Sequence, residues 1–158
     1  ALNDNNVNIP KELIFKGDYT YRKGYEGALS LLKQDKPFTA LFCGNDQSAM
    51  SAIAAITNKG LEVPNDISVM GYDDMNIARY TSPPLTTVRI PFNRMAVSAT
   101  RRLLNLCYNL ELNIEYDFPI QLIERLSVKK LYVPWFSMAG FMKIPGTELI
   151  LFFNYRKD

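Results

Sequence analysis

The chain has 158 residues, of which 47% are hydrophobic and 22% are charged, and its formal net charge is +2. These values are typical of one globular domain with its own core, and they exclude a disordered chain. The small net charge argues against a duplex-binding surface in this segment. Because the sequence contains no histidine, Ser-His-Asp and Cys-His nucleophiles, His-dependent zinc sites and imidazole acid–base chemistry are excluded.

The two cysteines, Cys43 and Cys107, lie far apart in the sequence, each in an apolar stretch. This placement predicts reduced core thiols in a cytosolic protein rather than a disulfide. No apolar run approaches the roughly 20 residues that a membrane span needs, and the first residues lack the layout of a signal peptide. We therefore expect a cytoplasmic protein with no membrane partner.

Strands and helices alternate in the first part of the chain. A turn into a short strand is predicted over residues 9–15, followed by an amphipathic helix over 21–33. The apolar run 38–43 predicts a strand buried on both faces of a parallel sheet, residues 47–58 a second amphipathic helix, and 67–70 a second buried strand. Two parallel strands joined by a crossover helix form a right-handed unit, so the pattern predicts an open α/β sheet.

A third strand is predicted over the β-branched run 86–90, and Pro91 is well suited to open the long helix that follows. A further strand is predicted over 118–124, where the regular pattern ends. One stripe of the long helix is apolar and comprises Phe92, Met95, Ala99, Leu103, Leu106, Cys107 and Leu110.

Polar side chains follow two of the predicted strands. Asn45, Asp46 and Gln47 come after the first, and Asp73 and Asp74 come after the second. Ligands of open α/β sheets bind outside the carboxyl ends of the strands, and amides and carboxylates there suit a polyhydroxylated ligand. The same residue types are common as helix caps and turn formers, so the spacing leaves both roles open.

Two other chemistries are disfavoured by the motifs. Asp73 and Asp74 could be the paired carboxylates of an acid–base enzyme, but adjacent side chains at a strand end usually diverge. No glycine-rich phosphate loop and no cluster with metal-ligand spacing occurs in the sequence. We therefore expect no catalytic residues, no cofactor and no metal.

Three segments taken together carry a family resemblance: Gly44–Gln47, Gly60–Asp74 and Pro83–Val88. In order and spacing they resemble the lactose/galactose repressor family of bacterial transcription regulators. Ile77–Thr81 followed by Leu85–Arg89 is most similar to the galactose-operon regulators within it. The resemblance covers residues 1–128 and implies a periplasmic-binding-protein-like fold, in which two α/β lobes enclose a sugar effector.

The resemblance also implies which parts of such a regulator this chain holds. The helix-turn-helix headpiece, most of the first lobe and the opening strand of the second would lie upstream of Ala1, so operator DNA would be contacted only through the missing headpiece. Residues 93–112 would belong to the other lobe, and their apolar stripe would pack on a dimer mate or on the tail. Residues 129–158 depart from the family. We interpret them as read-through past a frameshift or lost stop; the alternative is a real hairpin, turning at Pro145-Gly146, that covers apolar surface.

Individual positions acquire roles from the same resemblance. It implies that Asn45 and Asp73 hydrogen-bond to sugar hydroxyls, that Gln47 lies beside them, and that Tyr19 stacks on the ligand while Phe92 forms another wall of the site. It also implies a homodimer.

The dimer surface implied by the resemblance comprises Met50 and the segment containing Ile77, Tyr80 and Thr81, although Met50 suits a core position equally well. The leading hypothesis is the effector-binding part of a regulator that responds to galactose or a related sugar. The alternatives are a sugar-binding protein of a transport system and an enzyme that uses Asp73 as its base.

Overall fold

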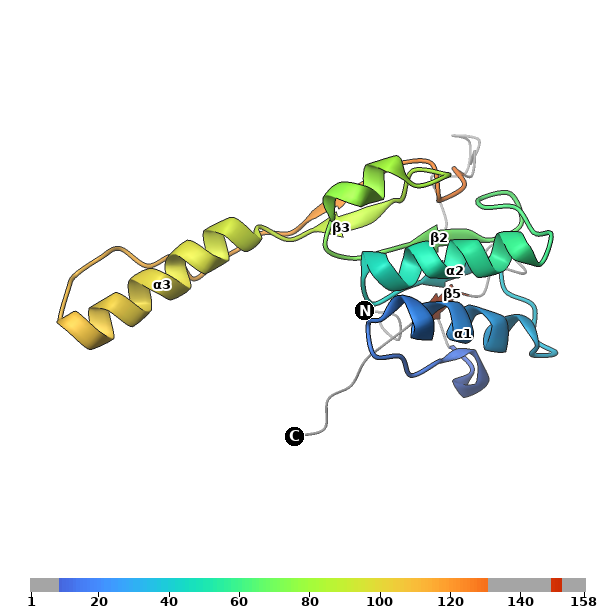
Figure 1. Ribbon diagram of the computed structural model, residues 1–158, viewed down its shortest axis with the longest axis horizontal. Coiled ribbons are helices and arrows are strands. Elements are labelled where there is room, and N and C mark those ends of the chain that lie inside the picture. The colour runs from blue at the N-terminus through green and yellow to red at the C-terminus, as the bar shows by residue number, and fades with distance from the viewer. Residues whose placement is uncertain (1–8, 131–148, 152–158) are drawn as a thin grey trace, which may run out of the picture.

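The computed structural model describes residues 9–130 and 149–151. These residues form a lobe, which contains a sheet and two helices, and an arm, which contains one long helix (Figure 1). The elements in chain order are η2 (Lys11–Leu13), α1 (Tyr21–Leu32), β1 (Ala40–Phe42), α2 (Asp46–Asn58), β2 (Ser68–Met70), η3 (Asn76–Tyr80), β3 (Thr87–Arg89), α3 (Phe92–Tyr108), β4 (Gln121–Ile123) and β5 (Leu149–Leu151).

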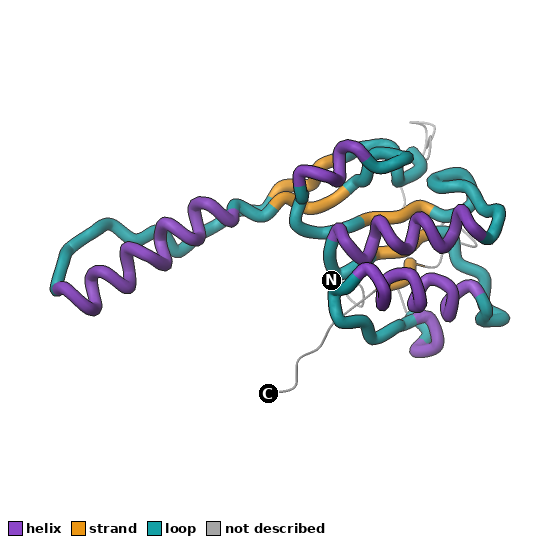
Figure 2. The backbone as a smooth tube through the Cα atoms, in the orientation of Figure 1, coloured by secondary structure: helices purple, strands orange, loops and turns teal. Residues whose placement is uncertain are grey.

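The sheet of the lobe has β1 at its centre, between β2 and β5. Both neighbours run parallel to β1, so that Leu41 lies opposite Val69 on one side and Ile150 on the other. Helices α1 and α2 pack against each other and lie together in front of this sheet (Figures 1 and 2). The expected α/β architecture, with helices flanking a parallel sheet, is confirmed.

Burial alternates along β1 and β2 and the residues that adjoin them. Leu41 and Cys43 are buried, as are Ile67 and Val69, whereas the residues between them are half-buried. Because side chains of a strand point alternately to its two faces, one face of the sheet is well covered and the other only partly. The prediction that these strands are buried on both faces is wrong, because α1 and α2 lie on the same face.

Close contact between α1 and α2 depends on Gly24. A Cβ atom at this position would lie 2.6 Å from both the backbone Cα and the carbonyl oxygen of Ser48, and 2.3 Å from Oγ of Ser51. Backbone atoms cannot move aside as a flexible side chain can, so the two helices would have to separate. Gly24 therefore sets the distance between the helices that carry the core.

We expect Gly24→Ala to lower the free energy of unfolding by about 1–3 kcal/mol, the cost of overpacking a close-packed interior. Urea denaturation followed by circular dichroism measures the loss. Arg22→Ala on the same helix is the control, since that side chain is 72% exposed and its ion pair with Glu26 spans 3.6 Å; it should change stability by about 0.5 kcal/mol or less. Equal losses in the two variants would contradict the packing argument.

The arm begins at a two-stranded antiparallel sheet, in which Thr87 of β3 lies opposite Ile123 of β4. From β3 the chain enters α3, which extends away from the lobe, and the segment after α3 returns beside it (Figure 1). Asn105 holds this segment, because its amide both donates to the carbonyl oxygen of Leu112 and accepts from the Leu112 N–H, each at 2.9 Å. Several large apolar side chains of α3 are exposed: Phe92, Met95, Val97, Leu103, Leu106 and Tyr108.

Two predictions of local structure fail. Residues 9–15 contain the short helix η2 instead of a strand, because the Leu13 N–H donates to the carbonyl oxygen of Pro10 at 3.0 Å and satisfies the backbone locally. Cys43 is buried as predicted, but Cys107 is exposed on α3, which does not pack on the sheet. The hairpin turn predicted at Pro145-Gly146 lies outside the described residues.

Candidate functional site

The carboxyl ends of β1 and β2 are joined by a backbone contact. The N–H of Asp46, at the start of α2, donates to the carbonyl oxygen of Tyr72, just after β2, at 2.8 Å. This hydrogen bond brings the segment containing Asn45 next to the one containing Asp73. The two segments that carry the predicted polar residues therefore meet at the carboxyl end of the sheet, where ligands of open α/β sheets bind.

Asn45 is the N-cap of α2. Its Oδ1 accepts from the N–H of Ser48 at 2.9 Å, and its Nδ2 donates to the carbonyl oxygen of Tyr19 at 3.0 Å. Tyr19 has a left-handed backbone, with φ of 66°, and the residue is 45% exposed. Because a primary amide has two N–H groups and two acceptor sites, Asn45 keeps one of each for a ligand.

The capping role has a consequence for stability. We expect Asn45→Ala to lower the free energy of unfolding by about 1 kcal/mol, because the Ser48 N–H loses its acceptor. Asn45→Asp keeps an acceptor oxygen at the helix start and should retain most of the stability. Thermal unfolding of both variants measures the difference. Equal melting temperatures would show that the helix cap contributes nothing to stability.

Asp73 has a half-buried side chain at the end of β2. Its backbone is left-handed, with φ of 115°, and its N–H donates to the carbonyl oxygen of Val88 at 2.9 Å. Burial, together with the nearby charge of Asp46, raises the pKa of the Asp73 carboxyl to about 6. Within the described part of the chain this carboxylate accepts no hydrogen bond, and the half-buried side chain of Gln47 makes none either. Asp73 therefore offers an unused acceptor in the segment that is hydrogen-bonded to the start of α2.

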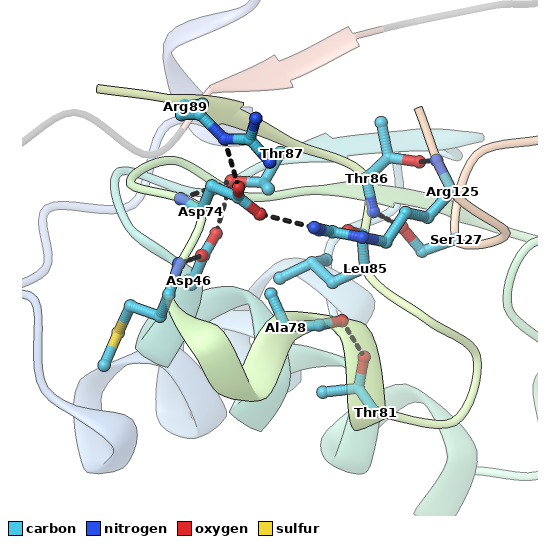
Figure 3. Close-up of polar contacts among 11 residues, drawn as sticks. Asp46, Asp74, Ala78, Thr81, Leu85, Thr86, Thr87, Arg89, Arg125 and Ser127 are labelled. Atoms are coloured by element: carbon cyan, nitrogen blue, oxygen red, sulfur yellow. Dashed lines mark hydrogen bonds and ion pairs between the residues drawn. The ribbon is translucent and has the colours of Figure 1, made fainter. Parts of the chain in front are cut away.

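A buried carboxylate lies beneath this edge. The Asp46 side chain is fully buried; its Oδ1 accepts from the hydroxyl of Thr87 at 2.5 Å, and its Oδ2 from the N–H of Met75 at 2.7 Å (Figure 3). Burial raises the pKa of Asp46, and these two hydrogen bonds offset only part of that effect. Asp46 thereby joins α2 to the loop after β2 and to β3.

Asp74 belongs to a second set of buried contacts. Its side chain is 3% exposed and pairs with Arg89 of β3, through Nε at 2.7 Å, and with Arg125 after β4, through Nη2 at 2.5 Å (Figure 3). Although burial acts to raise it, the hydrogen bonds from the two arginines hold the pKa of Asp74 below its ordinary value. Asp73 and Asp74 are thus adjacent in the sequence but have different surroundings.

The remaining predicted positions are scattered. Phe92 begins α3 and is 53% exposed, and no described hydrogen bond joins it to the strand ends. Ile77 and Tyr80 are exposed on η3, with Tyr80 at 76%. The Thr81 hydroxyl lies within hydrogen-bonding distance of the Ala78 and Pro83 carbonyl oxygens, and Met50 packs partly buried against the core.

Sequence reasoning missed Thr87, Arg89 and Arg125 as contributors to this region. Thr87 counted only as a β-branched strand residue, and Arg125 followed the last predicted strand without a motif. Thr87 lies 41 residues from its partner Asp46, and Arg125 lies 51 residues from its partner Asp74. No local signal could have identified these pairs.

Among the described residues, no helix is both long and apolar enough to cross a membrane. The same residues contain no group of three or more acidic or cysteine side chains arranged to hold a metal ion. The carboxyl edge of a parallel sheet is where open α/β folds bind small ligands, and here that edge carries an unused carboxylate and a partly free amide.

The comparison with known proteins defines the class further. The sequence profile of periplasmic binding protein-like domains matches residues 1–128. The chain belongs to this family, and it is similar to bacterial transcriptional regulators, among them solved regulators of the LacI family.

Two curated relatives illustrate this relationship. The transcriptional repressor PurR of Photorhabdus laumondii is 40% identical over 129 residues, which are 81% of this chain and 38% of the relative. The transcriptional regulator MalR of Clostridium butyricum is 38% identical over 125 residues, 79% of this chain and 37% of the relative. The chain therefore spans well under half the length of these regulators, neither of which is named as an enzyme or as a galactose regulator.

A solved structure agrees in fold. The sugar-binding transcriptional regulator of the LacI family from Escherichia coli, complexed with phosphate, superposes with a TM-score of 0.74 at 34% identity. The match covers 81% of this chain and 46% of that one. The periplasmic-binding-protein-like fold expected from the resemblance is confirmed.

Proposed function

We propose that this chain is the sugar-sensing part of a transcription regulator, and that its effector is galactose or a related sugar. The observation that carries the proposal is the half-buried Asp73 carboxylate, which has no partner within the described residues; its segment is hydrogen-bonded to that of Asn45, whose amide keeps one N–H and one acceptor site for a ligand. The sugar-binding regulator from Escherichia coli supports the ligand class, since the two chains share this fold.

The chemistry of the edge suits adjacent hydroxyl groups. A carboxylate accepts two hydrogen bonds from neighbouring hydroxyls, and the Asn45 amide donates one and accepts one. The exposed ring of Tyr19, whose carbonyl oxygen is held by Asn45, can stack on the apolar face of a sugar. Gln47 in the first turn of α2 and Phe92 at the start of α3 complete the proposed set.

A calorimetric titration of the 158-residue chain tests the proposal. The panel contains D-galactose, D-glucose, cellobiose and two purine bases, because the curated relatives do not fix the effector. We expect heat from a galactose-type sugar, and an Asp73→Ala variant that no longer responds. A response to purine bases alone would contradict a sugar effector, and no response to any compound would contradict effector binding by this chain.

The partners follow from the same proposal. We propose that the regulator contacts operator DNA through a headpiece outside this chain, acts in the cytoplasm, and forms a homodimer using Ile77, Tyr80, Thr81 and Met50. The exposed Ile77 and Tyr80 support that surface. The 158-residue chain alone should leave operator DNA unretarded in a gel-shift assay, and specific retardation would contradict this assignment.

Residues 129–158 remain a proposed extension beyond the family part of the chain, arising from read-through. Residues 129, 130 and 149–151 of this segment are described, and the last three form β5, which pairs in parallel with β1.

A further inference from the structure

We propose that Thr87 and Asp46 are positioning residues for the effector: the Thr87 hydroxyl fixes the Asp46 carboxylate, which accepts from the N–H of Met75 just after Asp74, while the Asp46 backbone N–H bonds the carbonyl oxygen of Tyr72 just before Asp73. This inference rests on the proposed function of the same sheet edge. Neither residue touches the ligand in this proposal, because Asp46 and Thr87 are both fully buried.

Asp46 forms hydrogen bonds with the loop after β2 at two points. Its N–H donates to the carbonyl oxygen of Tyr72, and its Oδ2 accepts from the N–H of Met75. Tyr72 immediately precedes Asp73, and Met75 immediately follows Asp74. One residue of α2 therefore brackets the two loop residues, including the one proposed to bind the sugar.

The bracketed residues need such support. Asp73 and Asp74 have φ values of 115° and 54°, in the region that residues other than glycine adopt at a cost. A loop held there only by its own preferences would relax to other conformations and lose the direction of the Asp73 carboxylate. The external hydrogen bonds make the observed conformation the stable one.

Thr87 determines where the Asp46 carboxylate points. Its hydroxyl lies 2.5 Å from Oδ1, a short distance for a hydroxyl donating to a carboxylate, and leaves Oδ2 for Met75. Gly71 closes the space on another side, since a Cβ atom there would lie 2.3 Å from the same Oδ1. With the carboxylate confined in this way, loss of the hydroxyl removes its anchor on β3.

A purely structural role for Asp46 is the competing explanation, because a carboxylate in the first turn of a helix also stabilises that helix. The two explanations differ in what a change at Thr87 does. A structural role lowers overall stability, whereas a positioning role loosens residues 73–75 and weakens effector binding beyond any loss of stability.

The experiment compares three substitutions in the 158-residue chain. Thr87→Val removes the hydroxyl with little change in shape, and Thr87→Ser keeps it. Thr86→Val is the matched control: Thr86 is the buried neighbour on the chain, and its hydroxyl accepts from the Arg125 N–H at 2.9 Å rather than contacting Asp46. If Thr87→Val does not fold, Thr87→Ala replaces it.

The first measurement is amide hydrogen exchange without any ligand. We expect the Met75 and Asp73 amides to exchange about tenfold faster in Thr87→Val, which is the loss of about one buried hydrogen bond, and at nearly the unmodified rate in Thr87→Ser and Thr86→Val. Equal exchange at these amides in Thr87→Val and Thr86→Val would overturn the proposal.

The second measurement is the affinity for D-galactose by calorimetry. We expect about tenfold weaker binding in Thr87→Val, and affinities close to that of the unmodified chain in Thr87→Ser and Thr86→Val. Unchanged affinity in Thr87→Val despite faster exchange would overturn the link to the effector. If the unmodified chain binds no sugar, the proposed function fails, and the exchange measurement alone decides whether Thr87 holds the loop.

Discussion

Arg125→Met is expected to lower the free energy of unfolding by about 3 kcal/mol, a value typical of breaking a buried ion pair by removing one partner. Arg125 is only 13% exposed, and its guanidinium bonds both to Asp74 and, through Nη1 at 2.6 Å, to the carbonyl oxygen of Leu85. Methionine keeps the apolar stem but leaves Asp74 with one fewer cation and the Leu85 carbonyl without this donor. Urea denaturation at pH 7 measures the loss.

Arg89→Met is the matched control, because Arg89 pairs with the same carboxylate but is 47% exposed. Its loss should cost about 1 kcal/mol or less, as exposed ion pairs do. Equal costs for the two arginines would contradict the dependence on burial.

The pH dependence gives an independent check of the same pair. The pKa of Asp74 is lowered in the folded protein, so its contribution is complete above the ordinary aspartate pKa of about 4 and is lost as the pH falls through the lower folded value. The difference in stability between the unmodified chain and Arg125→Met should therefore shrink in acid. A constant difference from pH 7 to pH 2 would contradict this assignment.

The sequence predicted the elements whose signals are local. The apolar spacing over 21–33 and 47–58 predicted α1 and α2 to within a residue at either end, because an amphipathic stripe and its terminating residues lie within one segment. The runs 38–43 and 67–70 likewise contained β1 and β2. Residues 9–15 failed because a run of seven residues fits a strand and a single helical turn equally well, and only the hydrogen bond to the Pro10 carbonyl decides.

The candidate site was predictable only in part. The rule that ligands bind at strand ends located Asn45 and Asp73, but it could not show that the Asn45 amide caps α2 and holds Tyr19 at the same time. Nor could it separate Asp73 from Asp74, whose surroundings differ because Arg125 reaches Asp74 from 51 residues away. Contacts across such distances depend on how β3 and β4 pair, and no local pattern reports that pairing.

Asp73→Asn is expected to change affinity and stability in opposite directions. Binding of D-galactose at pH 7.5 should weaken about 10- to 100-fold, because an amide replaces a charged acceptor of the sugar hydroxyls. The sugar-free chain should become more stable, because burial disfavours the carboxylate and asparagine tolerates a left-handed backbone. Calorimetry and urea denaturation of one preparation measure both effects.

The pH profiles follow from the pKa of about 6 at Asp73. Because this pKa is raised, the stability it contributes is present below the ordinary aspartate pKa of about 4 and is lost as the pH rises through 6. Sugar affinity should run the other way, rising as the carboxylate ionises, and Asp73→Asn should remove the contribution of this carboxyl from both profiles. Asp35→Asn, at an exposed aspartate, should leave the sugar affinity at pH 7.5 unchanged. If Asp73→Asn lowered both stability and affinity, the Asp73 carboxylate would be a group that stabilises the fold. Opposite changes would identify a carboxylate that binds the ligand and lowers the stability of the folded chain.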